Sequence, residues 1–91
     1  MNVELDSDLV KKLKKLDVKI RGSFKVRIIK FSKNPQDPQL NNHKLKREWR
    51  GYRSIDITAD WRAIFKEIKG NEGTIAYFVA IGTHKELYKN N

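Results

Sequence analysis

The residue types best suited to chemistry lie between Trp49 and Arg62, where aromatic rings, guanidinium groups and carboxylates alternate along the chain. This alternation predicts two neighbouring strands joined at Ala59-Asp60. In the first strand, over residues 52–58, the polar side chains at even positions point to one face. The mostly apolar side chains at odd positions point to the other. A surface of this kind could bind and process a phosphodiester backbone.

These residues are expected to be positioned by an α+β fold in which a short strand and two helices precede an antiparallel strand meander. The short strand is expected at Val3 and Leu5, and helical periodicity predicts helices over residues 8–16 and 19–33. The other expected elements are a connector over 34–42, strands over 43–49, 52–58, 61–68 and 74–81, a hairpin turn at Gly70 to Gly73, and a short C-terminal helical turn over 84–88. We expect the helices to cover one face of the sheet and to leave the other face open for a ligand.

The strand over residues 74–81 is nearly all apolar, so we expect it to be central in the sheet and covered on both faces. Gly82 is expected to end this strand. Just beyond it, His84 and Tyr88 lie four residues apart, which places their rings on the same side of a single helical turn.

The composition predicts one small soluble domain, residues 1–91, that binds an anionic partner. A chain of 91 residues can bury one modest core, and the absence of cysteine excludes disulfides and thiolate metal sites. The N-terminus has no signal pattern and no apolar run is long enough to span a bilayer, so we expect a cytoplasmic protein. The formal net charge of +9 favours a nucleic acid as the partner, then an acidic protein, and last a membrane surface.

Four blocks of the sequence resemble successive segments of the RelE/ParE toxin superfamily, and most closely its YafQ-like branch. The blocks are Asn-His-Lys-Leu at 42–45, Trp-Arg-Gly-Tyr-Arg-Ser-Ile at 49–55, Asp-Trp-Arg-Ala-Ile-Phe-Lys at 60–66 and Ile-Gly-Thr-His-Lys-Glu-Leu-Tyr at 81–88. The resemblance implies a RelE-like two-layer fold and a toxin of a type II toxin–antitoxin pair that cuts messenger RNA on the translating ribosome without a metal or other cofactor. It also implies a cognate antitoxin, which is expected to be acidic and partly disordered.

The resemblance further implies roles for individual residues. His84 matches the histidine of the Gly-Thr-His block and is the first candidate for a general acid or base, because histidine ordinarily titrates near neutral pH. His43 matches another family histidine that could share the proton transfer. Asp60 could orient a histidine or take a proton, whereas acting as an acid would require its pKa to rise from the ordinary ~3.9. Tyr88 matches an aromatic position that stacks on a base.

Arg62 matches an arginine of the wider superfamily that would stabilise the charge developing on the phosphorane. The implied reaction is attack of a ribose 2′-hydroxyl on the adjacent phosphate, which displaces the 5′-oxygen and leaves a 2′,3′-cyclic phosphate. The residues expected to bind the RNA are Lys46, Arg47, Arg50, Arg53, Trp61 and Tyr88. Two positions depart from the branch, since Asp56 replaces a frequent histidine and Ala80 replaces an arginine. These departures put part of the catalytic apparatus in question.

Several alternatives stay open at this point. Without the resemblance, His84 reads as a surface residue, Asp60 as a turn cap, and Trp49 and Trp61 as packing residues. A zinc site would have to be assembled without a close-spaced ligand pair, from His43, His84, Asp56 and Asp60. At the level of function, the alternatives are a ParE-like gyrase-inhibiting toxin without nuclease activity and an RNA-binding relic with weakened catalysis.

Overall fold

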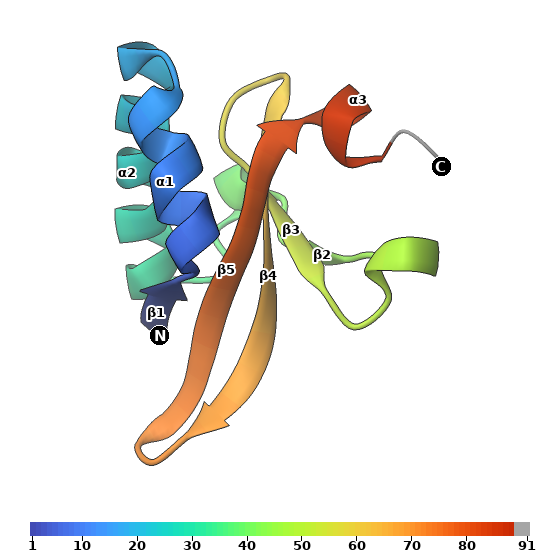
Figure 1. Ribbon diagram of the computed structural model, residues 1–91. Coiled ribbons are helices and arrows are strands. Elements are labelled where there is room, and N and C mark those ends of the chain that lie inside the picture. The colour runs from blue at the N-terminus through green and yellow to red at the C-terminus, as the bar shows by residue number, and fades with distance from the viewer. Residues whose placement is uncertain (89–91) are drawn as a thin grey trace.

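The computed structural model describes residues 1–88, in which a five-stranded sheet separates two groups of helical segments (Figure 1). The elements in chain order are β1 (Asn2–Leu5), α1 (Ser7–Lys15), α2 (Val18–Lys33), the 3₁₀ turn η1 (Pro38–Leu40), β2 (His43–Lys44), the 3₁₀ turn η2 (Arg47–Trp49), β3 (Arg53–Asp56), β4 (Trp61–Gly70), β5 (Gly73–Thr83) and α3 (His84–Leu87). In Figure 1, α1 and α2 lie on one side of the sheet, and η2 and α3 lie on the other. The expected α+β architecture is therefore confirmed.

Both long helices begin at an aspartate cap. The side chains of Asp6 and Asp17 each accept a hydrogen bond from the backbone N–H two residues further on. As the sequence predicted, α2 ends before Asn34-Pro35, since the residue that precedes a proline avoids the helical conformation. Within residues 1–88, no helix is long and apolar enough to cross a membrane.

The sheet is organised around the long antiparallel hairpin of β4 and β5, which pairs from Trp61 opposite Thr83 down to the turn that follows Gly70. The strands lie in the order β1-β5-β4-β3-β2. β1 is added at the edge of the sheet in parallel with β5, with Asn2 opposite Ile75. A parallel pair requires a long crossover connection, and here the segment from α1 to β4 separates β1 from β5 in the sequence. The sheet is therefore mixed, a feature that the sequence did not predict.

Three phenylalanines from different elements form the centre of the core. The ring of Phe31 on α2 lies 5.0 Å from that of Phe65 on β4 and 5.4 Å from that of Phe78 on β5, measured between centroids. The two strand rings are 4.8 Å apart, and at most 1% of any of the three residues is exposed. Aromatic pairs at such separations add to the stabilisation that area burial provides. The core thus fixes α2 against the two strands that support the opposite face.

One prediction about the middle of the chain is wrong, and another lacks detail. The expected strand over residues 43–49 stops after Lys44, and Arg47 has a φ of 59°. This value lies in the left-handed region, so it breaks the extended chain and begins η2 instead. The connector over residues 34–42 is also more than a loop, because it contains η1 and buries Leu40 completely in the core.

The strand predicted over residues 74–81 lies inside the sheet as expected, but it is not covered on both faces. β5 lies between β1 and β4 and continues through Gly82 to Thr83. Its Phe78 side is buried against the helices, whereas Tyr77 on the other side is only half-buried. The strand is therefore fully covered on the face where α1 and α2 pack, whereas the short α3 covers only its end on the other face.

The hydroxyl of Tyr77 donates a 2.6 Å hydrogen bond to Oδ1 of Asp6, which joins β5 to the start of α1. This bond lowers the pKa of Asp6 below its ordinary value and raises the pKa of Tyr77. We expect Tyr77→Phe to lower the free energy of unfolding near neutral pH, and this loss to shrink in acid. A depressed carboxylate pKa contributes stability that is complete above the ordinary pKa and disappears as the pH falls through the folded-state pKa.

Urea unfolding of wild type and Tyr77→Phe from neutral to acidic pH measures this difference. Tyr52→Phe is the matched control, because it also removes a tyrosine hydroxyl. Both rings contact Lys66, whose Nζ lies 5.9 Å from the ring centroid of Tyr52 and 6.0 Å from that of Tyr77. A Tyr77→Phe difference that stayed constant through the acid range would rule out the proposed link to Asp6.

Candidate active site

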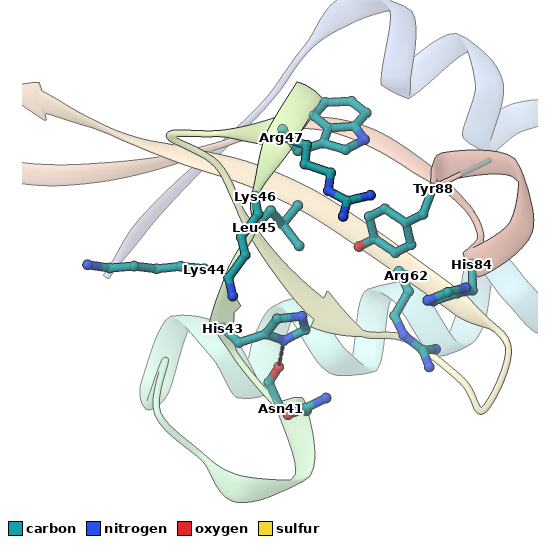
Figure 2. A pocket seen from close by; sticks show the side chains of 10 residues that line it. Asn41, His43, Lys44, Leu45, Lys46, Arg47, Arg62, His84 and Tyr88 are labelled. Carbon is teal, nitrogen blue, oxygen red and sulfur yellow. Dashed lines mark hydrogen bonds between the residues drawn. The ribbon is translucent and has the colours of Figure 1, made fainter. Parts of the chain in front are cut away.

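An open pocket of about 570 Å³ lies on the side of the sheet opposite α1 and α2, between α3, the start of β4 and the segment from Asn41 to Trp49 (Figure 2). Its walls are formed by Asn41, His43, Lys44, Leu45, Lys46, Arg47, Trp49, Arg62, His84 and Tyr88. The pocket therefore brings together many of the residues that the sequence nominated for proton transfer and RNA binding. Those residues are His43, Lys46, Arg47, Arg62, His84 and Tyr88.

His84 is placed at the start of α3 by the local backbone. Its N–H donates a 3.0 Å hydrogen bond to the carbonyl oxygen of Asp60, and its own carbonyl accepts one of 3.0 Å from the N–H of Tyr88. The helix begins with a capping box in which the hydroxyl of Thr83 accepts from the N–H of Glu86 and the carboxylate of Glu86 accepts from the N–H of Thr83. The latter bond also lowers the pKa of Glu86. The exposed His84 imidazole is thus carried by a fixed turn.

Tyr88 lies beside His84 and reaches down to the sheet. The two ring centroids are 4.7 Å apart at an interplanar angle of 68°, so the predicted placement of both rings on one side of a turn is confirmed. The hydroxyl of Tyr88 donates a 3.0 Å hydrogen bond to Oγ of Ser54 on β3, which is completely buried. Tyr88 therefore covers part of the sheet face that was expected to be open, and it forms the floor of the pocket beside His84.

His43 lies across the pocket from His84, on the edge strand β2 (Figure 2). Its Nδ1 is 2.7 Å from the backbone carbonyl oxygen of Asn41. Because a carbonyl oxygen can only accept, Nδ1 must carry the hydrogen in this contact. In the neutral ring, Nε2 is then the nitrogen with a free lone pair, so His43 is oriented as a proton acceptor.

Arg62 is held in place by Asp56 and by the loop between β3 and β4. Asp56 and Arg62 are direct cross-strand partners, and Nε of Arg62 lies 3.0 Å from Oδ1 of Asp56. This contact has the distance of an ion pair but not the geometry of a hydrogen bond, so charge attraction dominates it. Nη1 also donates to the carbonyl oxygens of Thr58 at 2.9 Å, Ala59 at 3.2 Å and Trp61 at 3.0 Å. Nε thus pairs with the end of β3, while Nη1 fixes the loop.

The far wall of the pocket belongs to η2. Trp49 donates a 2.9 Å hydrogen bond from its indole Nε1 to the carbonyl oxygen of Leu87 at the end of α3, and its ring packs against Tyr52 with centroids 5.4 Å apart. The side chain of Arg47 points into the pocket toward Tyr88 (Figure 2). The sequence alone indicates that Trp49 is a packing residue. Its place in the block at 49–55 is the one indication that it could lie near the site.

Four of the nominated residues do not line the pocket. Asp60 is exposed on the loop before β4 and contributes its carbonyl, not its carboxylate, to the contact with His84. Arg50 is exposed after η2, and Arg53 donates from Nε to Oδ1 of Asn42 at 2.8 Å. Trp61 packs partly buried against the hydrophobic core. Their assigned roles in binding or catalysis stay predictions.

The alternative of a zinc site finds no support in the arrangement of side chains. Within the described part of the chain, no three His, Asp or Glu residues are grouped closely enough to hold a metal ion. Asp56 is instead paired with Arg62, and His43 lies opposite His84 across the pocket.

Comparison with known proteins gives one family and several similar structures. A family model described as the bacterial toxin of a type II toxin–antitoxin system, YafQ, matches residues 4–89. No curated protein sequence matches significantly. The structure is similar to YafQ from E. coli strain BL21(DE3), with a TM-score of 0.74 and 22% identity over 96% of this chain and 97% of that one.

Two further structures share the fold. A YoeB/ParE toxin from Agrobacterium tumefaciens gives a TM-score of 0.72 at 16% identity, over 92% of this chain and 99% of that one. A chain of an archaeal RelE–RelB complex from Pyrococcus horikoshii OT3 gives a TM-score of 0.68 at 14% identity, over 90% of this chain and 92% of that one. At these identities the structural likeness supports the fold, while the family model covers nearly the whole sequence.

Proposed function

From the premise that this chain belongs to the YafQ family of toxins of type II toxin–antitoxin systems, we propose that it is an endoribonuclease that cleaves messenger RNA on the translating ribosome. The observation that carries the proposal is the pocket itself, where two histidines from distant parts of the sequence flank one cavity beside an arginine and a tyrosine. Two imidazoles in one cavity can supply both roles that this cleavage requires, because one group must accept a proton while another donates one.

The proposed reaction uses His43 as the general base and His84 as the general acid. Nε2 of His43 takes the proton of a ribose 2′-hydroxyl, and the resulting oxygen attacks the adjacent phosphorus. The bond from phosphorus to the 5′-oxygen breaks as His84 protonates that oxygen, which leaves a 2′,3′-cyclic phosphate and a 5′-hydroxyl. The carbonyl of Asn41 favours the base role of His43, because it fixes the hydrogen on Nδ1. Tyr88 positions His84, and its ring can stack on a nucleobase of the RNA.

The positive charge near the phosphate comes from two kinds of side chain in this proposal. Arg62 is pre-oriented, because Asp56 and three carbonyls hold it, and a fixed guanidinium can stabilise developing charge without reorganisation. Lys46 and Arg47 are exposed on the pocket wall and can follow the RNA backbone. Asp56 therefore acts here by orienting Arg62, in place of the proton-transfer role that a histidine would have.

Primer extension on a message in a reconstituted translation reaction tests the proposal. Wild-type protein is expected to produce discrete cuts whose upstream fragments end in a 2′,3′-cyclic phosphate. No cuts in the presence of intact translation would overturn the ribonuclease proposal. In that case, inhibition of gyrase supercoiling would favour the ParE-like alternative, and RNA binding alone would favour the relic.

The partner proposed for the toxin is a cognate antitoxin that is acidic and partly disordered. Similar structures include complexes of this kind, such as the DinJ–YafQ complex of E. coli, whose matched chain has a TM-score of 0.64 at 23% identity over 96% and 97% of the two chains. The net charge of +9 supports an acidic partner, because complementary charge steers association and favours that partner over others.

Arg47→Gly is expected to weaken RNA binding roughly tenfold while leaving the fold intact, because it removes one cation from the pocket wall. The same change relieves the left-handed backbone at φ 59°, so the free energy of unfolding should change by no more than about 1 kcal/mol. Fluorescence anisotropy with a single-stranded RNA measures the affinity, and urea unfolding measures the stability. Arg50→Ala is the control, since it removes the same charge outside the pocket. An equal loss of affinity in both variants would mean that Arg47 contributes only to the general surface charge.

A further inference from the structure

His43 lies in a part of the fold that gives it little support of its own. β2 contains only His43 and Lys44, it forms an edge of the sheet, and both residues are exposed. The imidazole nevertheless has a defined orientation, because its Nδ1 donates to the carbonyl oxygen of Asn41 at 2.7 Å (Figure 2). The position of this carbonyl therefore decides which ring nitrogen of His43 carries the hydrogen.

The carbonyl of Asn41 belongs to the peptide group that joins Asn41 to Asn42, and the fold holds this group from both sides. Asn41 has a left-handed backbone, with φ 49° and ψ 47°, a conformation that asparagine adopts more readily than most residues. Its N–H donates to the carbonyl oxygen of Pro38 at 3.3 Å, and the preceding Leu40 is completely buried in the core. The core thus fixes the chain on the near side of the carbonyl.

On the far side of the carbonyl, the half-buried side chain of Asn42 makes two hydrogen bonds. Its Nδ2 donates to the carbonyl oxygen of Pro35 at 2.9 Å, and its Oδ1 accepts from Nε of Arg53 on β3 at 2.8 Å. Only this orientation of the amide fits, because a carbonyl oxygen only accepts and a guanidinium only donates. Asn42 is therefore fixed between the connector and the sheet.

Arg53 makes this contact from the side of the sheet that faces away from the pocket. It is the cross-strand partner of Phe65, which is buried in the core against α2. The next residue, Ser54, points to the opposite face, where its Oγ accepts from Tyr88. Alternation along β3 therefore directs Arg53 away from the pocket, where it meets Asn42.

We propose that Asn42 and Arg53 are positioning residues for His43. Their hydrogen bond fixes the peptide group whose carbonyl holds the hydrogen on Nδ1, and it thereby keeps Nε2 free to accept the proton of the ribose 2′-hydroxyl. The base role of His43 rests on the proposed function, whereas the control of its tautomer is a property of the fold alone. Arg53 then has a different role from the RNA contact that the sequence predicts.

The two roles of Arg53 make different demands on its side chain. An RNA contact requires the positive charge, whereas the bond to Asn42 requires only an N–H at the position of Nε. Glutamine supplies that N–H without the charge, because its amide nitrogen lies as many bonds from Cα as Nε of arginine does. Methionine has a stem of similar length and supplies neither.

The first measurement is ¹⁵N NMR of the imidazole tautomers in histidine-labelled full-length protein, in mildly alkaline solution where the neutral rings predominate. The chain has 2 histidines, so His84 serves as an internal reference. We expect wild-type His43 to carry its hydrogen on Nδ1. Asn42→Ala and Arg53→Met should each move a large share of this hydrogen to Nε2, whereas Arg53→Gln should not.

The second measurement is single-turnover cleavage on stalled translation complexes, with RNA affinity from anisotropy. Asn42→Ala and Arg53→Met should each slow cleavage by roughly tenfold to a hundredfold, because a displaced catalytic group loses its alignment. Asn42→Ala/Arg53→Met should be no slower than either single variant, since both changes remove the same bond. Arg53→Gln should cut at nearly the wild-type rate. Arg21→Met is the charge control on exposed α2, and Arg53→Met should change RNA affinity no more than this control does.

Two results would overturn the inference. One is an unchanged Nδ1 tautomer of His43 in both Asn42→Ala and Arg53→Met, which would show that the carbonyl of Asn41 needs no help from the pair. The other is a loss of RNA affinity in Arg53→Gln as large as that in Arg53→Met, with cleavage slowed to match, which would identify Arg53 as an RNA contact. A wild-type protein that cuts no message would overturn the nuclease proposal, and the tautomer spectra alone would then support or overturn the positioning role.

Discussion

His84→Ala is expected to reduce the rate of messenger RNA cleavage by roughly 10²–10⁴-fold, because it removes the proposed general acid from the pocket. The loss should appear in the cleavage step and leave RNA affinity nearly unchanged, since the cations of Lys46, Arg47 and Arg62 stay in place. Single-turnover cleavage on stalled translation complexes measures the first quantity, and anisotropy with labelled RNA measures the second.

Lys85→Ala is the matched control for this variant. Lys85 is the next residue of α3, is exposed and does not line the pocket, so its removal should change cleavage little. Both substitutions lie on an exposed turn and should alter the free energy of unfolding by less than about 0.5 kcal/mol. A His84→Ala protein that cut messages at the wild-type rate would remove His84 from the mechanism.

Phe31→Ala is expected to lower the free energy of unfolding by about 3–5 kcal/mol. The side chain is fully buried and its ring contacts two others, at 5.0 Å from Phe65 and 5.4 Å from Phe78, so its loss leaves a cavity between α2 and the sheet. Small domains have a total stability of about 5–15 kcal/mol, so the variant would keep only a small margin. Urea unfolding followed by circular dichroism measures the change.

Two companion variants set the scale for Phe31→Ala. Phe31→Leu keeps most of the volume and should cost clearly less, because a smaller cavity is left. Val26→Ala lies on the exposed side of the same helix and should have a small effect, within about 0.5 kcal/mol. A loss below about 1 kcal/mol for Phe31→Ala would show that the core closes around the missing ring.

The sequence predicted the helices and the long hairpin well because their signals are local. Helical periodicity within each segment indicates the two helices, and Gly70 to Gly73 indicates the hairpin turn. The segment around Arg47 was mispredicted because a left-handed backbone is rare for arginine and no local pattern indicates it. The parallel pairing of β1 depends on contacts with β5, far along the chain, which periodicity cannot reveal.

The candidate site was predictable in its residues but not in its contacts. The sequence blocks nominated His43, His84 and Tyr88, and the fold places all three in one pocket. The pairing of Asp56 with Arg62 was missed because the predicted two-residue turn at Ala59-Asp60 would place Arg62 opposite Ile57, whereas the observed register places it opposite Asp56. A departure at Asp56 that looked like a loss is therefore compatible with a positioning role.

The parallel pairing of β1 with β5 sets the order in which the protein can become active during its own synthesis. Residues 2–5 must wait for residues 75–78 before their edge of the sheet can close, and His84 and Tyr88 follow later still. A nascent chain that has emerged only as far as β4 contains α1 and α2 but neither β5 nor the pocket wall that α3 forms. An unfinished chain therefore lacks the complete pocket, and incomplete products carry an unpaired strand edge, which exposes them to aggregation and degradation.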